Sequence, residues 1–263
     1  MVVVGVAVAP VEAPLAGAPT AASAGNIFIQ IRNTVIIRWR RLWTHLSHVG
    51  LGARKGRPDG SDDNYPSHLA WRSMEALLML LDCLYLPEIA LRIHQIFKPN
   101  TRRLYPDEIE MARSIFGESI DYQKVRIDGH ARIGCRKYHF AYVSFQMINT
   151  WGLLSDRHFI HEMVHIWQYQ RLGSVYIPRA LYAQRTAQGY NYGGIAGLRA
   201  AAEQGRGLSD FNFEQQGDVV ADYFCLLRGY APLWCVGEVG YLVDFERVIR
   251  IPPLIPPPKG RGT

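Results

Sequence analysis

The sequence has few cysteines, and they follow no pattern. Four occur among 263 residues, and none forms a CxxC pair or a spacing typical of metal ligands. This count excludes a disulfide-held scaffold, and 24 glycines exclude a collagen-like chain. Hydrophobic residues make up 48% and charged residues 20%, the balance of a globular protein that buries a core. We therefore expect one large or two small folded domains.

Export and membrane signals are also scarce. No lysine or arginine precedes Arg32, whereas a Sec signal peptide needs basic residues ahead of its apolar stretch. We predict that residues 1–25, rich in Val, Ala and Pro, form a disordered apolar leader, with a cryptic signal peptide as the alternative. Charged residues interrupt the longest apolar run, residues 71–96, so we expect no transmembrane helix. The prediction is a protein that is cytoplasmic in the producing cell and that is secreted, if at all, by a non-Sec route.

Basic charge is concentrated in one segment. Residues 26–60 contain seven Lys or Arg and one acid, Asp59, which leaves 22 basic and 22 acidic residues in the rest of the chain. A protein that binds nucleic acid should have a broader basic face, so we predict no nucleic-acid partner.

The same segment contains a predicted amphipathic helix. Spacings of three and four residues give it one apolar stripe, with three arginines off the stripe. The stripe is Val35, Trp39, Leu42, Leu46 and Val49, and the arginines are Arg38, Arg40 and Arg41. We predict that the stripe packs on the protein while the arginines face water. Contact of residues 27–49 with an anionic membrane surface is the alternative that we do not favour.

Other periodic patterns predict an α+β fold. Helices are expected over 66–96, bent or broken at Pro87, and over 101–117, 155–171 and 213–228. Short strands are expected near residues 125–127 and 138–144. We divide the chain into the leader, a basic helical extension over 26–97, a main domain over 98–250, and a proline-rich tail over 251–263.

The helix predicted over 155–171 contains the motif HExxH. On a helix His161 and His165 lie one turn apart on one face, where both imidazoles can reach one Zn²⁺ ion. Glu162 lies beside them, where it could act as a general base on a metal-bound water. The motif also arises by chance, so a histidine pair without metal is the alternative. His158 is about 10.5 Å along the helix axis from His165, so we expect it only at the rim of such a site.

The helix predicted over 213–228 offers a third ligand. Glu214, Asp218 and Asp222 share one face of it. A solvated acidic stripe is one interpretation, but the neighbouring residues are strongly apolar, and buried carboxylates need cations or hydrogen-bond donors. A coherent assignment makes Glu214 the third ligand and Asp218 the acceptor from a ligand histidine. Asp218 and Asp222 remain the other candidates for the third ligand.

HExxH followed by a helix with ExxxD resembles the gluzincin metallopeptidases. A closer resemblance is to Vgr-related bacterial domains, including the metallopeptidase domain attached to some type VI secretion spike proteins. Its matching segments lie within residues 100–230: 106–109, 112–117, 120–122, 125–127, 159–168, 190–192 and 213–216. Two departures are Gly217 within the second motif's helix, where it could allow a close approach of the first helix, and the basic stretch 132–138.

The resemblance implies a zincin-like domain that hydrolyses peptide bonds. Zn²⁺ would be its cofactor, held by His161, His165 and Glu214, with Asp218 orienting a ligand and Glu162 as the base. It also implies a peptide or protein substrate and a type VI secretion spike component as partner, as expected for a secreted effector. A non-catalytic, zinc-stabilised binding or delivery module is the alternative.

Substrate contacts are less defined by the sequence. Tyr190 or Tyr192 could donate a hydrogen bond to the oxyanion, although each could instead only pack in its glycine-rich loop. Residues 138–145 are the best candidate for an edge strand that pairs with a peptide, and an ordinary core strand fits them equally well.

Overall fold

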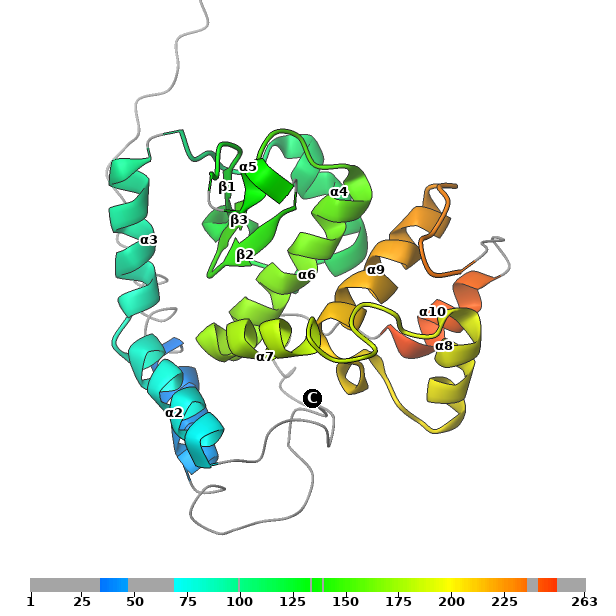
Figure 1. Ribbon diagram of the computed structural model, residues 1–263, viewed down its shortest axis with the longest axis horizontal. Coiled ribbons are helices and arrows are strands. Elements are labelled where there is room, and N and C mark those ends of the chain that lie inside the picture. The colour runs from blue at the N-terminus through cyan, green and yellow to red at the C-terminus, as the bar shows by residue number, and fades with distance from the viewer. Residues whose placement is uncertain are drawn as a thin grey trace, which may run out of the picture.

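The computed structural model describes residues 34–46, 69–98, 100–132, 134–138, 140–235 and 241–249. The predicted leader over 1–25 and tail over 251–263 lie outside these residues. Within them, many helices accompany one small three-stranded sheet that lies toward one end of the molecule (Figure 1), which confirms the α+β prediction. None of the described helices is long and apolar enough to cross a membrane.

The helices follow one another along most of the chain. The first covers residues 34–46. It is followed by α2 (Leu69–Cys83), α3 (Leu86–Phe97), α4 (Pro106–Phe116), α5 (Cys135–Tyr138), α6 (Asp156–Leu172), α7 (Tyr176–Ala183), α8 (Gly194–Glu203), α9 (Phe213–Leu227) and α10 (Leu242–Val248).

Local signals explain the two helices that matter most for function. The Ser155 side chain accepts a hydrogen bond from the backbone N–H of His158 and caps α6, and the positive φ of Gly173 ends that helix. Asn212 caps α9 in the same way, through the N–H groups of Glu214 and Gln215. Both helices therefore begin and end within about two residues of their predicted bounds. The helix predicted over 66–96 is broken at the left-handed Tyr85, two residues before Pro87.

The sheet contains β1 (Arg126–Asp128), β2 (Tyr142–Ser144) and β3 (Met147–Asn149), in the order β1-β3-β2. β1 is parallel and β2 antiparallel to the central β3. The strand predicted over 138–144 is wrong at its beginning, because Tyr138 ends α5. The rings of Tyr138 and Phe140 are stacked, with centroids 6.5 Å apart, so their alternating spacing reflects ring contacts rather than a strand.

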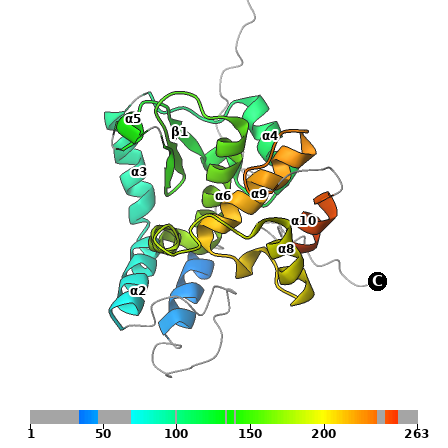
Figure 2. The same cartoon turned by 45° about the vertical axis from the view of Figure 1, so that its right-hand side comes forward.

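The main core lies between α6 and α9, which Figure 2 shows side by side. Ile160, Met163 and Val164 of α6 are buried against residues such as Val220 and Phe224 of α9. Because every residue of α6 from Phe159 to Tyr169 is buried, this helix runs through the centre of the domain. Its polar residues are therefore enclosed and need partners from neighbouring elements.

The N-terminal helices form a separate edge of the molecule (Figure 1). Helix 34–46 packs on α2 and on the segment after α6 through a small core, formed by Leu42, Met79, Cys83 and Val175. The predicted orientation of this helix is wrong. Of its predicted stripe only Leu42 is buried, whereas Trp39 and Leu46 are exposed and Val49 lies outside the described residues.

Buried carboxylates explain why the helix is turned. Arg38 forms an ion pair with Glu88 and donates to the backbone carbonyl of Asp82. Arg41 is enclosed beside Asp82, and this burial lowers the pKa of Arg41 to about 10. Asp82 is itself buried and accepts hydrogen bonds from Ser174. Arg38 and Arg41 thus face the protein because the corner between α2 and α3 needs positive charge, whereas Arg40 is exposed.

Candidate metal centre

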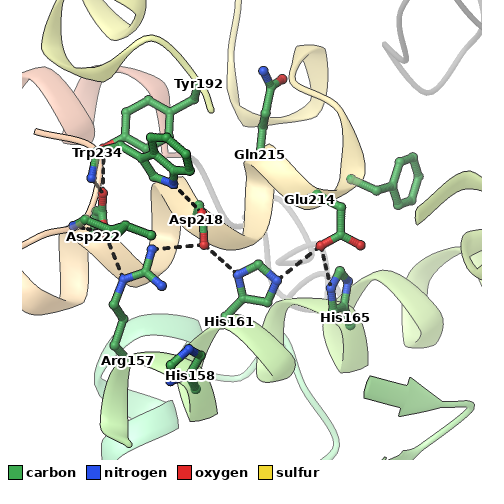
Figure 3. Close-up of polar contacts among 12 residues, drawn as sticks. Arg157, His158, His161, His165, Tyr192, Glu214, Gln215, Asp218, Asp222 and Trp234 are labelled. Carbon is green, nitrogen blue, oxygen red and sulfur yellow. Dashed lines mark hydrogen bonds and ion pairs between the residues drawn. The ribbon is translucent and has the colours of Figure 1, made fainter. Parts of the chain in front are cut away.

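Three predicted ligands meet between α6 and α9. His161 and His165 project from α6 toward Glu214 on the first turn of α9 (Figure 3). All three side chains are buried, and one ligand atom from each lies within 4.8 Å of the others. This buried His-His-Glu cluster could bind a metal ion.

The spacing of these atoms fits a tetrahedral ion. Glu214 Oε2 lies 3.3 Å from His161 Nε2 and 3.4 Å from His165 Nε2. Ligands that bind zinc at about 2.1 Å in a tetrahedron are separated from one another by about 3.4 Å. The two carboxylate–imidazole separations therefore match those that the ion would require.

The other ring nitrogens are already engaged. His161 Nδ1 lies 2.8 Å from Asp218 Oδ1, and His165 Nδ1 lies 2.8 Å from Gln168 Oε1. Since a carboxylate or amide oxygen accepts, each Nδ1 is the donor in these contacts, and each Nε2 faces the shared point, where it can bind a cation once its own proton is lost. Gln168 is fixed in turn, because its Nε2 donates to the Phe213 carbonyl and to Gln216 Oε1.

Asp218 is held by a wider polar network. Arg157 donates to Asp218 Oδ1 at 2.9 Å and to Asp222 Oδ1 at 3.1 Å, and the Trp234 indole donates to Asp218 Oδ2 (Figure 3). Burial alone would raise the pKa of Asp218, but His161, Arg157 and Trp234 hold it below its usual value. The carboxylate thus stays charged and fixes the His161 ring.

Asp222 has a structural position in this network rather than one at the cluster. It accepts hydrogen bonds from the backbone N–H groups of Leu233 and Trp234, and from the Tyr192 hydroxyl at 2.9 Å. Tyr192 is buried there, and its hydroxyl donates to Asp222 rather than pointing at the candidate ligands. The oxyanion role that we considered for Tyr192 therefore has no support in this geometry.

Tyr190 lies over the cluster instead. Its ring centroid is 5.9 Å from that of His161, and the residue is partly exposed. Burial and the nearby carboxylates, Glu214 first, raise its pKa, so its hydroxyl remains a donor at neutral pH. His158, on the preceding turn of α6, has its Nδ1 2.8 Å from Ser155 Oγ and takes no part in the cluster, as expected.

Glu162 carries an unusual carboxylate. Its Oε2 is buried and accepts no hydrogen bond from the described residues. Burial raises the pKa of Glu162, and the two histidines only partly oppose this. A buried carboxylate oxygen without a protein donor, beside a ligand cluster, fits a position next to a metal-bound water.

The electrostatics of the cluster favour positive charge. Burial would raise the pKa of Glu214, but His165 and His161 lower it well below its usual value. Burial would lower the pKa of His161, but Asp218 and Glu214 raise it to about 10. Without a metal ion the site therefore holds protons that a bound cation would replace.

Gly217 allows the two helices to meet at the cluster. A Cβ atom at this position would lie 2.5 Å from Cε1 of His161, a distance that no packed side chain tolerates. We predicted that Gly217 allows a close approach of the first helix. The group that comes close is the His161 ring, not the backbone of α6.

Sequence reasoning missed several supporting residues. Gln168 lies three positions after His165 and Arg157 four before His161, so helical spacing alone could have suggested both. Gln184, which donates to Glu214 Oε1 at 2.9 Å, and Trp234 come from segments whose approach no local pattern indicates.

Comparisons with known proteins agree with part of the resemblance. No family model matches the chain. The chain is 36% identical over 140 residues to the type VI secretion system spike protein VgrG2b of Pseudomonas aeruginosa. That match covers 47% of this chain and 13% of VgrG2b, so the chain spans only a small part of that protein's length.

One solved structure also matches part of the chain. The effector domain of Pseudomonas aeruginosa VgrG2b is 25% identical, and the match covers 57% of this chain and 84% of that domain with a TM-score of 0.36. By the sequence match, the chain is similar to part of a type VI secretion spike protein, as the Vgr-related resemblance predicted.

Proposed function

We propose that this protein is a zinc-dependent, metallopeptidase-like hydrolase that cleaves peptide bonds. The observation that carries the proposal is the convergence of His161, His165 and Glu214 on one point, beside a Glu162 carboxylate oxygen that accepts no hydrogen bond from the described part of the chain. A structural site has no need of a buried base beside its ligands. The proposal therefore extends to a catalytic site with one open ligand position, in a zincin-like domain over residues 98–250.

The ligand set favours zinc. Two imidazole nitrogens and one carboxylate oxygen form a common catalytic zinc set, and the Nδ1 partners Asp218 and Gln168 supply the usual orienting hydrogen bonds. When bound, zinc would polarise the scissile carbonyl and lower the pKa of a water at the open position.

The protein's own residues would complete the chemistry. Glu162 is the general base, which receives the proton of the attacking water at its free Oε2 and passes it to the leaving amine. Its raised pKa favours this role, because the carboxylate must hold the proton between the two steps. Tyr190 is the candidate donor to the oxyanion, since its hydroxyl remains protonated and its ring centroid lies 5.9 Å from that of His161.

The relationship to VgrG2b supports a place in type VI secretion. The matching solved structure is described as an effector domain, and the matching protein is a spike protein. We infer that this chain acts as an effector associated with a spike component, and that its substrate is a peptide or protein.

One substitution tests the catalytic proposal. Glu162→Gln preserves the size of the side chain but cannot take the proton, so it should retain zinc and lose peptide hydrolysis by at least a hundredfold. Wild-type protein and His161→Ala are measured beside it, for zinc content and for cleavage of a peptide library. If zinc-loaded wild-type protein cleaves nothing, or Glu162→Gln cleaves as well as wild type, the chain is a zinc-stabilised binding or delivery module instead.

A further inference from the structure

Two N-terminal helices have an exposed apolar stripe with the same spacing. On helix 34–46 the stripe is Ile36, Trp39, Trp43 and Leu46, and on α3 it is Leu86, Ile89, Ile93 and Ile96. Each stripe has successive spacings of three, four and three residues, so each forms one continuous helix face. All eight side chains are at least 41% exposed, with Trp43 at 75% and Ile96 at 76%.

The stripes face outward because polar residues occupy the inner faces. Arg38 of helix 34–46 pairs with Glu88 of α3 and lies over the Tyr85 ring at 4.4 Å, which joins the two helices. At the far end of α3, Lys98 pairs with the buried Asp128 of β1. These contacts fix the helices in place. The exposed stripes are therefore a defined surface, which we call the outer stripes, and such surfaces mark sites of interaction.

We propose that the outer stripes dock on an anionic lipid surface. Apart from Arg38 and Arg41, which face the protein, the segment 26–60 carries five basic residues and one acidic residue, whereas the charge in the rest of the chain is balanced. An anionic surface complements that charge. Exposed tryptophans beside aliphatic residues and basic charge are the composition of helices that lie in the plane of a membrane interface.

The chemistry of the outer stripes favours lipid over a protein partner. Their eight side chains are aliphatic or indole, so the indole N–H groups are their only hydrogen-bonding atoms. A typical protein interface has about one hydrogen bond per 100–200 Å² of buried surface. A lipid surface requires burial of apolar area and attraction of charge, and it needs no such directional contacts.

Vesicle co-sedimentation of the full chain tests this proposal, which does not depend on the metal centre. Vesicles of phosphatidylcholine alone are compared with vesicles containing phosphatidylglycerol, at low and high salt. We expect binding to be on the order of tenfold stronger on anionic vesicles and to weaken at high salt. We expect the double variant Trp39→Ser, Trp43→Ser to bind the anionic vesicles roughly tenfold more weakly than the wild type does.

A matched control removes two exposed leucines elsewhere. Leu153 is 100% and Leu233 is 59% exposed, and both lie in the domain that contains the metal centre. Leu153→Ser with Leu233→Ser should bind vesicles like the wild type. Circular dichroism checks that each variant is folded, and Ile89→Ser with Ile93→Ser on α3 replaces the tryptophan variant if that one unfolds.

Several results would overturn the proposal. One is the absence of anionic vesicle binding at low salt, and another is equal binding to neutral and anionic vesicles. Retained binding in the folded tryptophan variant would show that the stripes are not used. A dimer detected by light scattering and lost in that variant would instead assign the stripes to a second copy of the chain.

Discussion

The α6–α9 pair and the N-terminal helices distribute polarity in opposite ways. Between α6 and α9, charged residues such as His161, Glu214 and Asp218 are buried and bonded to one another. On helix 34–46 and α3, large apolar residues such as Trp43 and Ile96 are exposed. Each arrangement costs free energy in an isolated protein, since buried charge loses hydration and exposed apolar surface orders water.

The difference indicates which kind of binding partner would stabilise each region. Buried histidines and carboxylates that converge within 4.8 Å are stabilised by a cation. Exposed apolar stripes are stabilised by another apolar phase. The two regions also differ in core size, because α6 and α9 share the main core while helix 34–46 and α2 share a small one. Substitutions in the two regions should therefore affect different properties and change the free energy of unfolding by different amounts.

The largest expected effect compares two methionines. Met163 of α6 is fully buried in the main core, and Met79 of α2 is at the edge of the small core. Met163→Ala should lower the free energy of unfolding by about 3–5 kcal/mol, and Met79→Ala by about 2 kcal/mol or less. Urea denaturation of both variants measures the difference, and equal losses would contradict the view that the N-terminal helices have the weaker core.

A glycine substitution tests the contact between α6 and α9. Gly217→Ala gains about 1 kcal/mol of helix propensity, but its Cβ would collide with the His161 ring. We expect a net loss of about 1–3 kcal/mol in stability together with weaker metal binding. Gly129→Ala is the control, since a Cβ there meets no atom within 4 Å. If Gly217→Ala is as stable as wild type and binds metal equally, the proposed close approach is wrong.

The metal-free protein should lose stability as the pH rises from about 6.5 to about 10. Burial would lower the pKa of His161, but Asp218 and Glu214 raise it to about 10, above the usual value of about 6.5. A pKa raised on folding contributes stability that is complete below the unfolded value and lost as the pH rises through the folded value. Urea denaturation across this range measures the slope, which His161→Gln should flatten. A wild-type slope equal to that of His161→Gln would exclude this coupling.

The smallest expected effect is on the exposed stripe. Trp43 is 75% exposed, so Trp43→Ser should change the free energy of unfolding by no more than about 0.5 kcal/mol. Thermal unfolding gives this value directly. A loss of several kcal/mol would show that Trp43 supports the fold rather than forming a docking surface.

The sequence predicted the parts of this protein that depend on local signals. Caps at Ser155 and Gly173 and the i, i+4 histidines are local, and the α6 bounds follow from them. The orientation of helix 34–46 could not be predicted in this way, because Arg38 turns inward toward Asp82 and Glu88, which lie 44 and 50 residues away. An apolar stripe and an arginine pair both compete for the interior, and here the buried Asp82 decides the outcome.

The candidate site shows the same division. Glu214 and Asp218 were predicted because ExxxD places them on one helix face, and their partners His161 and His165 share a face of α6. Trp234 reaches Asp218 from a segment without regular structure, and Tyr192 reaches Asp222 from a loop. Such contacts depend on the path of loops that bring distant residues to the site, and no periodicity in the sequence indicates that path.

The most direct test of the central claim is the metal content of the purified protein. Mass spectrometry of the metals should find one zinc ion per chain in the wild type and in Glu162→Gln. It should find little zinc in His161→Ala, His165→Ala and Glu214→Ala, provided that each variant is folded. Wild-type protein that retains no metal after incubation with zinc, or folded His161→Ala and His165→Ala variants that retain one ion, would contradict a metal centre built from these three residues.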